Sequence, residues 1–172
     1  MNMLKGEWLM LRPVEIGDLE VLYRWENDPE NWVHSNHLNP LSRFFLEQYI
    51  LNAENNIYSD KQLRLMVVGR DKQPVGIIDI FDFDPHHRRA AVGIIIDKDF
   101  RNKGHGTEAL RLVIQYANKT LNLKQLYCGI GTDNHVSLKL FKKQGFRITG
   151  TRLSWRLHHE QWRDEHFLQL VF

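Results

Sequence analysis

The sequence predicts a layered α/β or α+β fold, and three observations support this prediction. Short runs rich in β-branched residues, such as Ala90–Ile96, have the composition of buried strands. Segments with apolar residues at helical spacing lie between such runs, so strands and helices alternate along the chain. Residues that cap helices and glycines that end them stand at the borders of these segments.

The elements can be placed in order along the chain. Strands are expected at 8–12, 64–69, 75–81, 90–96, 125–130, 147–156 and 166–171. Helices are expected at 18–26, 42–53, 106–119 and 134–144. Ser42 is a candidate N-cap of the second helix, and Asp133 or Asn134 of the fourth. Gly145 permits a left-handed closure of the fourth helix before the apolar Phe146.

The composition is that of a globular protein. A chain of 172 residues buries roughly two thirds of its unfolded surface, so we expect a single domain over 1–172. It is 42% hydrophobic and 26% charged, and no run approaches the ~20 apolar residues of a membrane span. The net charge of +2, without a basic stripe, argues against nucleic acid as the main partner. Because residues 1–6 lack an apolar signal core, a cytoplasmic location is expected.

Neither a thiol nucleophile nor a metal centre is expected. The one cysteine, Cys128, has no partner for an internal disulfide and lies in an apolar stretch, where a buried thiol is the ordinary interpretation. The adjacent pairs His86–His87 and His158–His159 diverge on a strand, and no metal-binding spacing accompanies them.

The segment Arg101–Thr107 joins an apolar strand to an amphipathic helix and has the features of an anion cradle. Gly104 and Gly106 let the backbone turn tightly and approach a ligand. The free N–H groups of the new helix point into the loop, which favours a phosphate or pyrophosphate, and Arg101 and Lys103 add positive charge at the rim. The spacing Arg-x-x-Gly-x-Gly is neither that of a Walker loop nor that of a dinucleotide fold.

A second motif, NHVSLKLFKKQGF at 134–146, completes a pattern with this loop. Together the two resemble the acetyl-CoA-binding core of the GNAT N-acetyltransferase superfamily, with its Arg/Gln-x-x-Gly-x-Gly/Ala and Asn-x-x-Ser/Ala-x-x-Leu-(Tyr/Phe)-x-x-x-Gly-Phe signatures. The pattern of residues 11–13, 18–19 and 25–30 is similar to the branch containing ribosomal-protein N-terminal and spermidine acetyltransferases. The resemblance covers nearly the whole chain. It implies a mixed, mostly antiparallel seven-stranded sheet, split into a V at 90–96 and 125–130 and flanked by about four helices.

The resemblance implies that acetyl-CoA is the cosubstrate and that no metal takes part. In relatives the pantetheine lies in the split, its amides pair with strand backbone near Ile94 and Ile96, and the pyrophosphate lies in the loop. The residues implied in acetyl-CoA binding are Ile94, Ile95, Ile96, Arg101, Asn102, Lys103, Gly104, His105, Gly106, Thr107, Asn134, Phe141 and Lys143.

The implied reaction moves an acetyl group from a thioester to a primary amine. Such an amine has a pKa near ~10.4 and must lose a proton before it attacks. The site therefore needs a base, donors for the oxyanion and a proton for the departing thiolate. Alignment of the two reactants in one ternary complex supplies up to about 7–11 kcal/mol.

The chain departs from its relatives where protons are handled. Phe141 stands where many relatives have the tyrosine that protonates the thiolate, and phenylalanine has no proton to give. Ser137 occupies the Asn-x-x-Ser position and is the candidate substitute acid. Alternatively, it is an ordinary helix hydroxyl that bonds to the preceding turn.

The candidate base is Asp79. The strand that often reads Ala-Glu in relatives here reads Ala90-Ala91, so a common base carboxylate is absent. Asp79 matches a position where similar enzymes carry glutamate. A purely structural Asp79 is the alternative, and Asp82 and Asp84 are equally interpretable as loop acids.

The acceptor side is marked by charge and aromatic residues. Over 15–30 there are six acids and one base, Arg24. These acids form either a solvated helix face or an acidic wall that attracts a cationic acceptor. The substrate-binding candidates are Trp25, Glu26, Asp28 and Trp32, with core packing as the alternative for the aromatics. Residues 162–164 stand between the last two strands, where relatives close the acceptor site or form a dimer, and a plain surface loop is the alternative.

Three functions are compatible with these features. The first is an N-acetyltransferase acting on a polyamine, a protein N-terminus or another small amine. The second is an acyl-CoA-binding module with little turnover, suggested by Phe141 and Ala91. The third is an interaction domain that kept only the fold, against which the intact loop and Asn134 argue. The expected partners are a coenzyme A thioester and an amine, with a homodimer left open.

Overall fold

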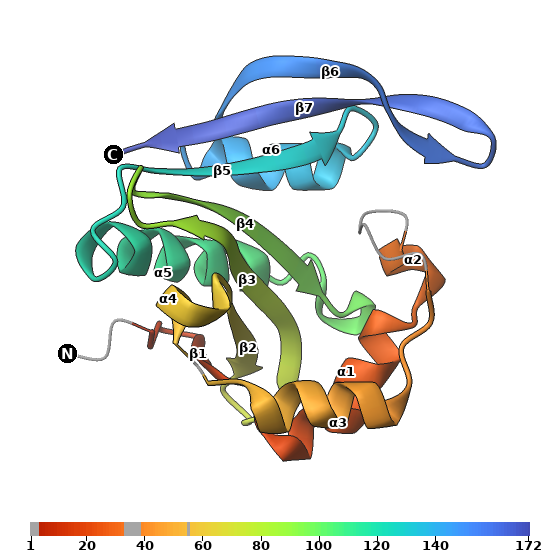
Figure 1. Ribbon diagram of the computed structural model, residues 1–172, viewed down its shortest axis with the longest axis vertical. Coiled ribbons are helices and arrows are strands. Elements are labelled where there is room, and N and C mark those ends of the chain that lie inside the picture. Colours follow the sequence, from red (N-terminus) through yellow and green to blue (C-terminus); the bar gives the residue numbers. More distant parts are fainter. Residues whose placement is uncertain (1–3, 33–38, 55) are drawn as a thin grey trace.

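A seven-stranded sheet runs through the computed structural model, which describes residues 4–32, 39–54 and 56–172 (Figure 1). The strand order is β1-β2-β3-β4-β5-β7-β6, and every neighbouring pair is antiparallel except β4 and β5. The strands are β1 Leu9–Pro13, β2 Leu63–Gly69, β3 Pro74–Asp84, β4 Arg89–Ile96, β5 Gln125–Gly131, β6 Arg147–His158 and β7 Gln161–Val171. The predicted mixed, mostly antiparallel sheet is confirmed.

The four expected helices are present, each within one residue of its predicted ends. They are α1 Leu19–Glu26, α3 Arg43–Asn52, α5 His105–Lys119 and α6 His135–Lys143. The Ser42 side chain accepts a hydrogen bond from the Phe45 N–H at 3.1 Å and caps α3, as predicted. Two further helices, α2 Pro29–Trp32 and α4 Ile57–Asp60, were not predicted, because four residues are too few to show a helical period.

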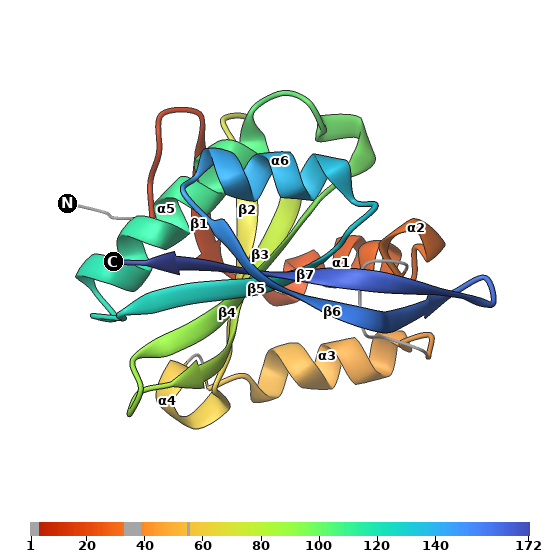
Figure 2. The ribbon, with the colours of Figure 1, turned by 90° about the horizontal axis from the view of Figure 1, so that it is seen from above.

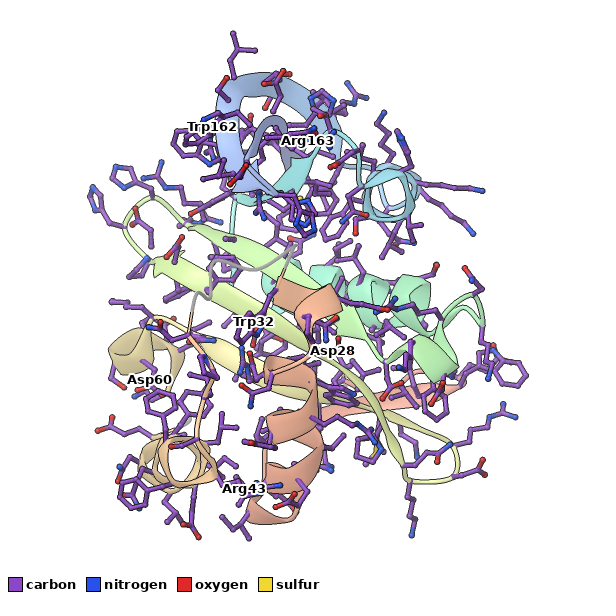
Figure 3. The ribbon with its side chains drawn as sticks, turned by 90° about the vertical axis from the view of Figure 1, so that its right-hand side faces the viewer. Asp28, Trp32, Arg43, Asp60, Trp162 and Arg163 are labelled. Atoms are coloured by element: carbon purple, nitrogen blue, oxygen red, sulfur yellow. The ribbon has the colours of Figure 1, made fainter. Side chains whose placement is uncertain are left out.

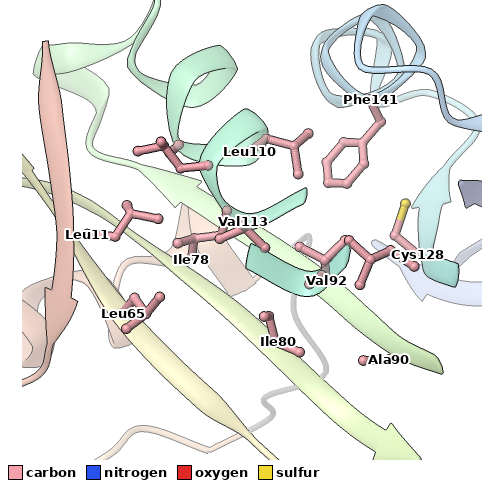
Figure 4. Close-up of a cluster of buried hydrophobic side chains, with 14 of the residues drawn as sticks. Leu11, Leu65, Ile78, Ile80, Ala90, Val92, Leu110, Val113, Cys128 and Phe141 are labelled. Carbon is pink, nitrogen blue, oxygen red and sulfur yellow. The ribbon is translucent and has the colours of Figure 1, made fainter. Parts of the chain in front are cut away.

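The helices cover the two faces of the sheet separately (Figure 2). Side chains of α5 and α6 pack on one face, against alternate residues of β2 to β5 (Figure 4). Leu22 and Trp25 of α1, together with Ile50 of α3, pack on the other face against Met66 and Ile77. Alternate residues of the central strands therefore pack into two different cores, one on each face of the sheet. This explains why these strands are nearly continuous apolar runs in the sequence.

The sheet separates between β4 and β5. Only three residue pairs join these strands, and the last of them is Ala91 with Tyr127. Beyond it, β4 continues to Ile96 and β5 to Gly131, and none of the described strands pairs with these two edges (Figure 1). The V predicted at 90–96 and 125–130 is thus present, and its arms leave two strand edges facing each other.

The last two strands differ from their predicted bounds. β7 begins at Gln161 rather than at 166, so that Trp162, Arg163 and Asp164 belong to a long hairpin and not to a loop. The turn consists of His159 and Glu160, both with positive φ (46° and 60°), as a two-residue hairpin turn requires. Sequence alone did not predict this turn because glycine or asparagine ordinarily marks it.

Candidate active site

The segment between β4 and α5 presents a row of backbone donors. Gly104 has φ +85°, a left-handed conformation that favours glycine, and is the N-cap of α5. Within the described residues, the N–H groups of 102–107 make no hydrogen bond; the first N–H engaged is that of Glu108, which donates to the Gly104 carbonyl at 3.1 Å. Consecutive free donors at the start of a 15-residue helix fit the pyrophosphate predicted here.

Side chains brace this loop from the outside. Arg101 donates from Nε to the Ile96 carbonyl at 3.0 Å and lies 3.7 Å from Glu30 of α2. Lys103 donates to the Asp99 carbonyl at 2.8 Å, and His105 Nδ1 lies 3.1 Å from the Phe100 carbonyl. These contacts fix the loop while keeping the charges of Arg101 and Lys103 at its rim. The exposed Asn102 has φ +61° and lets the chain turn.

The edge of β4 can receive a ligand that contains amides. The Asp97 N–H donates to the Val75 carbonyl of β3. The backbone of Ile95, two residues earlier, hydrogen-bonds in the same direction, toward β3. By the alternation of antiparallel strands, the backbone of Ile94 and Ile96 points into the V. The Ile95 side chain packs on the opposite face, with the α1 core. The backbone geometry fits a pantetheine in the split.

Gly106 lies where β4, α5 and α6 meet. A Cβ built on it would lie 3.4 Å from Leu140, 3.5 Å from Ile96 and 4.0 Å from Ile94. Ordinary contact distances of this kind leave room for one methyl group and for little more. The residue therefore keeps the entrance of the V open between β4 and α6.

Helix α6 carries the remaining predicted acetyl-CoA residues. The Asn134 side chain accepts the Ser137 N–H at 3.2 Å and caps the helix, which decides between Asn134 and Asp133. Phe141 is 3% exposed, with its ring edge-on to Phe146, so it acts mainly in the core (Figure 4). Lys143 is exposed near the end of the helix.

Ser137 lies one turn before Phe141 on α6 and is half-buried. None of the hydrogen bonds among the described residues involves its hydroxyl, so the expected alternative, a bond to the preceding helical turn, is not formed. The hydroxyl remains available to a ligand.

Asp79 lies on the α1 side of the sheet, within a cluster of three charged side chains. Arg64 binds both of its carboxylate oxygens, at 2.8 and 2.9 Å, and also donates to Glu26 Oε1 at 2.5 Å. We call Glu26, Arg64 and Asp79 the Arg64 triad. Burial alone would lower the pKa of Arg64, but the two carboxylates outweigh it and hold that pKa above its ordinary value. With two carboxylates and one guanidinium, the Arg64 triad has a formal charge of −1.

A cleft of about 420 Å³ opens beside the Arg64 triad. It lies between α3, α4 and β2, and its lining includes Phe45, Tyr49, Asp60, Gln62 and Arg64. Burial raises the pKa of Tyr49, whose ring centroid is 5.7 Å from the Arg64 guanidinium. Of the predicted aromatics, Trp25 does not reach this cleft: it is 2% exposed, and its indole N–H donates to Asp97 at 2.6 Å. Trp25 thus anchors α1 to the end of β4.

The acids of 15–30 do not form an open acidic wall. Asp18, Glu20, Glu26 and Glu30 each pair with an arginine, and Asp18 and Glu26 are buried. Asp28 accepts the Glu30 N–H at 2.9 Å within the first turn of α2. The Trp32 indole donates to the Glu26 carbonyl, and both Asp28 and Trp32 lie in front of β4 in Figure 3. Because four of these acids pair with arginines, little unpaired negative charge is left to attract a polycation.

This pairing makes a prediction about salt. Raising ionic strength should change kcat/KM for spermidine and for a singly charged monoamine by the same small factor, because few unpaired acids remain to be screened. Glu26→Gln should instead lower the free energy of unfolding by about 1–3 kcal/mol, since it replaces a charge-assisted hydrogen bond to the buried Arg64 with a neutral one while Asp79 remains. Steady-state rates at two salt concentrations and urea unfolding measure these effects. A salt effect confined to spermidine would restore the acidic wall.

A second charged cluster, which the sequence did not predict, lies on β6 and β7. Glu165 is 3% exposed and accepts from Arg152 at 2.9 Å through Oε1 and from Arg156 at 2.5 Å through Oε2. We call these three residues the Glu165 triad. They belong to no motif, and their proximity depends on the strand register and its bulges. In the sequence, Glu165 stands within the polar run Arg163–His166, so no local pattern marked it as buried.

Comparison with known proteins defines the family. A model of the GNAT acetyltransferase domain matches residues 9–147, most of the chain. The chain belongs to the GNAT acetyltransferase family. It is 27% identical over 159 residues to a spermidine N(1)-acetyltransferase of Escherichia coli K12, covering 90% of this chain and 81% of the relative. It is also 27% identical over 112 residues to an L-amino acid N-acetyltransferase of the same organism, covering 63% and 68%.

Solved structures agree on the fold of this GNAT protein. A spermidine N-acetyltransferase from Vibrio cholerae, in complex with CoA and spermine, superposes with a TM-score of 0.86 and 22% identity over 95% of both chains. Further structures of the Vibrio enzyme include a dodecameric one, with a TM-score of 0.80. The family match and the acetyltransferase relatives establish this chain as an acetyl-CoA-dependent N-acetyltransferase.

Other sequence expectations concern the thiol, metals and membranes. Cys128 is buried as predicted, and burial, together with the charge of Glu165, raises its pKa to about 12, so it is not a nucleophile at neutral pH. Within the described residues, no three side chains of the metal-binding types gather, and no helix is long and apolar enough to cross a membrane.

Proposed function

We propose that residues 1–172 act as a single N-acetyltransferase domain that transfers the acetyl group by direct attack of a primary amine in a ternary complex. The V supports this proposal most strongly. On one side, it is lined by the free donors of 102–107 and the edge of β4. On the other, it opens onto the face that carries the Arg64 triad and its cleft.

Different residues bind acetyl-CoA and transfer protons. The N–H groups of 102–107 hold the pyrophosphate, and the backbone of Ile94 and Ile96 aligns the pantetheine, whose thioester supplies the acetyl group. Asp79, held in place by Arg64, takes the proton of the acceptor ammonium, directly or through water. Ser137 gives its proton to the departing thiolate and regains one from the nitrogen of the tetrahedral intermediate, directly or through water.

The relatives restrict the range of candidate acceptor amines but do not identify the acceptor. Some are named for spermidine and one for L-amino acids, so both kinds of amine are candidates for this chain. A cytoplasmic location and a homodimer remain part of the proposal, supported by the bacterial relatives and by the oligomeric neighbour. An acyl-CoA-binding module with little turnover is the second candidate, favoured by Phe141 and Ala91, which leave two usual proton carriers absent.

Two measurements test the proposal together. Acetyl-CoA should raise the Tm, since binding to the folded state alone contributes about 2.7 kcal/mol at a concentration 100-fold above Kd. A screen of amines with acetyl-CoA should then release free thiol. A Tm shift without thiol release from any amine would favour the binding module, and the absence of both would contradict acetyl-CoA binding.

A further inference from the structure

The Glu165 triad has unused donors and an excess of positive charge. Two guanidinium groups share one carboxylate, which gives a formal charge of +1. Among the described residues, both terminal nitrogens of Arg156, and Nε and Nη2 of Arg152, make no hydrogen bond. The two side chains are 23% and 40% exposed, so these donors can reach a ligand. By contrast, three nitrogens of Arg64 are engaged by its two carboxylates.

The Glu165 triad is rigidly placed. A Cβ on Gly129 would collide with the Glu165 carboxylate, so that carboxylate lies directly over β5. The Arg152 guanidinium lies 5.0 Å from the centroid of Phe167 and 4.9 Å from that of Trp155, contacts that order its planar group. Preformed arginine forks of this kind bind carboxylates through paired, charge-assisted hydrogen bonds.

Strand register places the two triads on opposite arms of the V and on the same face. Asp79 pairs with Gly93 of β4, two residues beyond the last joined pair, Ala91 with Tyr127. Gly129 lies two residues beyond Tyr127, and the Glu165 carboxylate lies directly over it. Gly93 and Gly129 therefore face each other across the opening, with the Arg64 triad beyond one and the Glu165 triad beyond the other.

The charges of the two triads are complementary. One arm carries the Asp79 carboxylate, the proposed base, which stabilises an ammonium, and the other has +1 with free arginine donors. We propose that the acceptor of this enzyme is an amine that also carries a carboxylate, as an amino acid or short peptide does, and that Arg152 and Arg156 bind that carboxylate. The inference rests on the proposed function, because the Arg64 triad marks the amine only if acetyl transfer occurs there.

A purely structural role for the Glu165 triad does not account for its composition. One arginine would neutralise Glu165 and join β6 to β7, whereas a second, partly buried one adds an uncompensated charge that costs desolvation energy. A polycation such as spermidine would meet this excess positive charge, and it would bind less well for that reason.

The test compares matched acceptors with the full-length protein. Thiol release from acetyl-CoA is measured for a panel of L-amino acids and glycyl dipeptides, each beside its C-terminal amide, and for spermidine. We expect kcat/KM to be about 10- to 100-fold higher for the best acid than for its amide, the effect of a lost charge-assisted hydrogen bond. Equal rates for acids and amides, or a preference for spermidine, would overturn the inference and leave the proposed function intact. O-Phosphoethanolamine serves as a phosphate probe, and its preference over every carboxylate would also overturn the inference.

Variants and a binding measurement separate the two proposals. Arg156→Gln should lower kcat/KM for the acids to near that for the amides, mainly through KM. Arg147→Gln, which removes an exposed arginine from the same strand, should change neither value. Calorimetry of N-acetyl amino acids and their amides in the presence of CoA reports on the carboxylate without turnover. Selective binding of the acids without any thiol release would contradict only the proposed function; equal binding of both would refute the carboxylate site, even if Arg156→Gln fails to fold.

Discussion

Replacing Gly106 by valine should abolish the stabilisation of the protein by acetyl-CoA. The added branches would press on Leu140 and Ile96, whose atoms lie 3.4 and 3.5 Å from the position of a Cβ. Overpacking costs about 1–3 kcal/mol, and the side chain also fills the entrance between β4 and α6. We expect the Kd for acetyl-CoA to rise by ~10²-fold or more. The Tm shift on adding acetyl-CoA measures it.

Gly106→Ala is the matched control for this variant. Its single methyl group meets its neighbours at ordinary contact distances, so acetyl-CoA should bind nearly as in the parent. Circular dichroism and the Tm without ligand establish that both variants fold. If a folded Gly106→Val protein bound acetyl-CoA as tightly as the parent, the assignment of this entrance would be wrong.

Ser137→Ala should lower kcat by ~10²-fold or more, because the departing thiolate then lacks its proton donor. The Kd for acetyl-CoA should hardly change, since the helix cap uses the Ser137 N–H and not its hydroxyl. Steady-state kinetics with a saturating amine, together with titration of acetyl-CoA, separate the two quantities. Adding Phe141→Tyr should partly restore kcat by returning a phenol to α6.

The exposed neighbour Val136 provides the control for Ser137. Val136→Ala truncates a side chain on the same helix that is 75% exposed, and we expect kcat to stay within about twofold. A Ser137→Ala enzyme as fast as this control would show that solvent protonates the thiolate and that Ser137 is an ordinary helix residue.

Local signals made much of the fold and the acetyl-CoA side predictable. The loop at 101–107 and the caps at Ser42 and Asn134 are each formed by residues that are adjacent in sequence. Each can therefore be recognised without knowledge of tertiary contacts. Strand periodicity likewise located the core, although it could not assign the ends of β6 and β7, where the hairpin turn lacks glycine.

The acceptor side could not be predicted in the same way. The sequence shows the acids of 15–30 but not their partners, and Glu26 and Arg64 meet only because α1 packs against β2. Trp25 was expected at the substrate, yet its bond to Asp97 buries it. The Glu165 triad depends on register shifts in β6, which no local pattern encodes.

The narrow join between β4 and β5 also bears on how the protein unfolds. Only three residue pairs connect the backbone of β1–β4 to that of β5–β7, so the cohesion of the two parts depends on side chains shared beneath α5 and α6. Each part can therefore open as a separate cooperative unit of local unfolding. A molecule bound between the two strand edges would hydrogen-bond where a strand is missing and tie these units together, making the whole chain unfold as one.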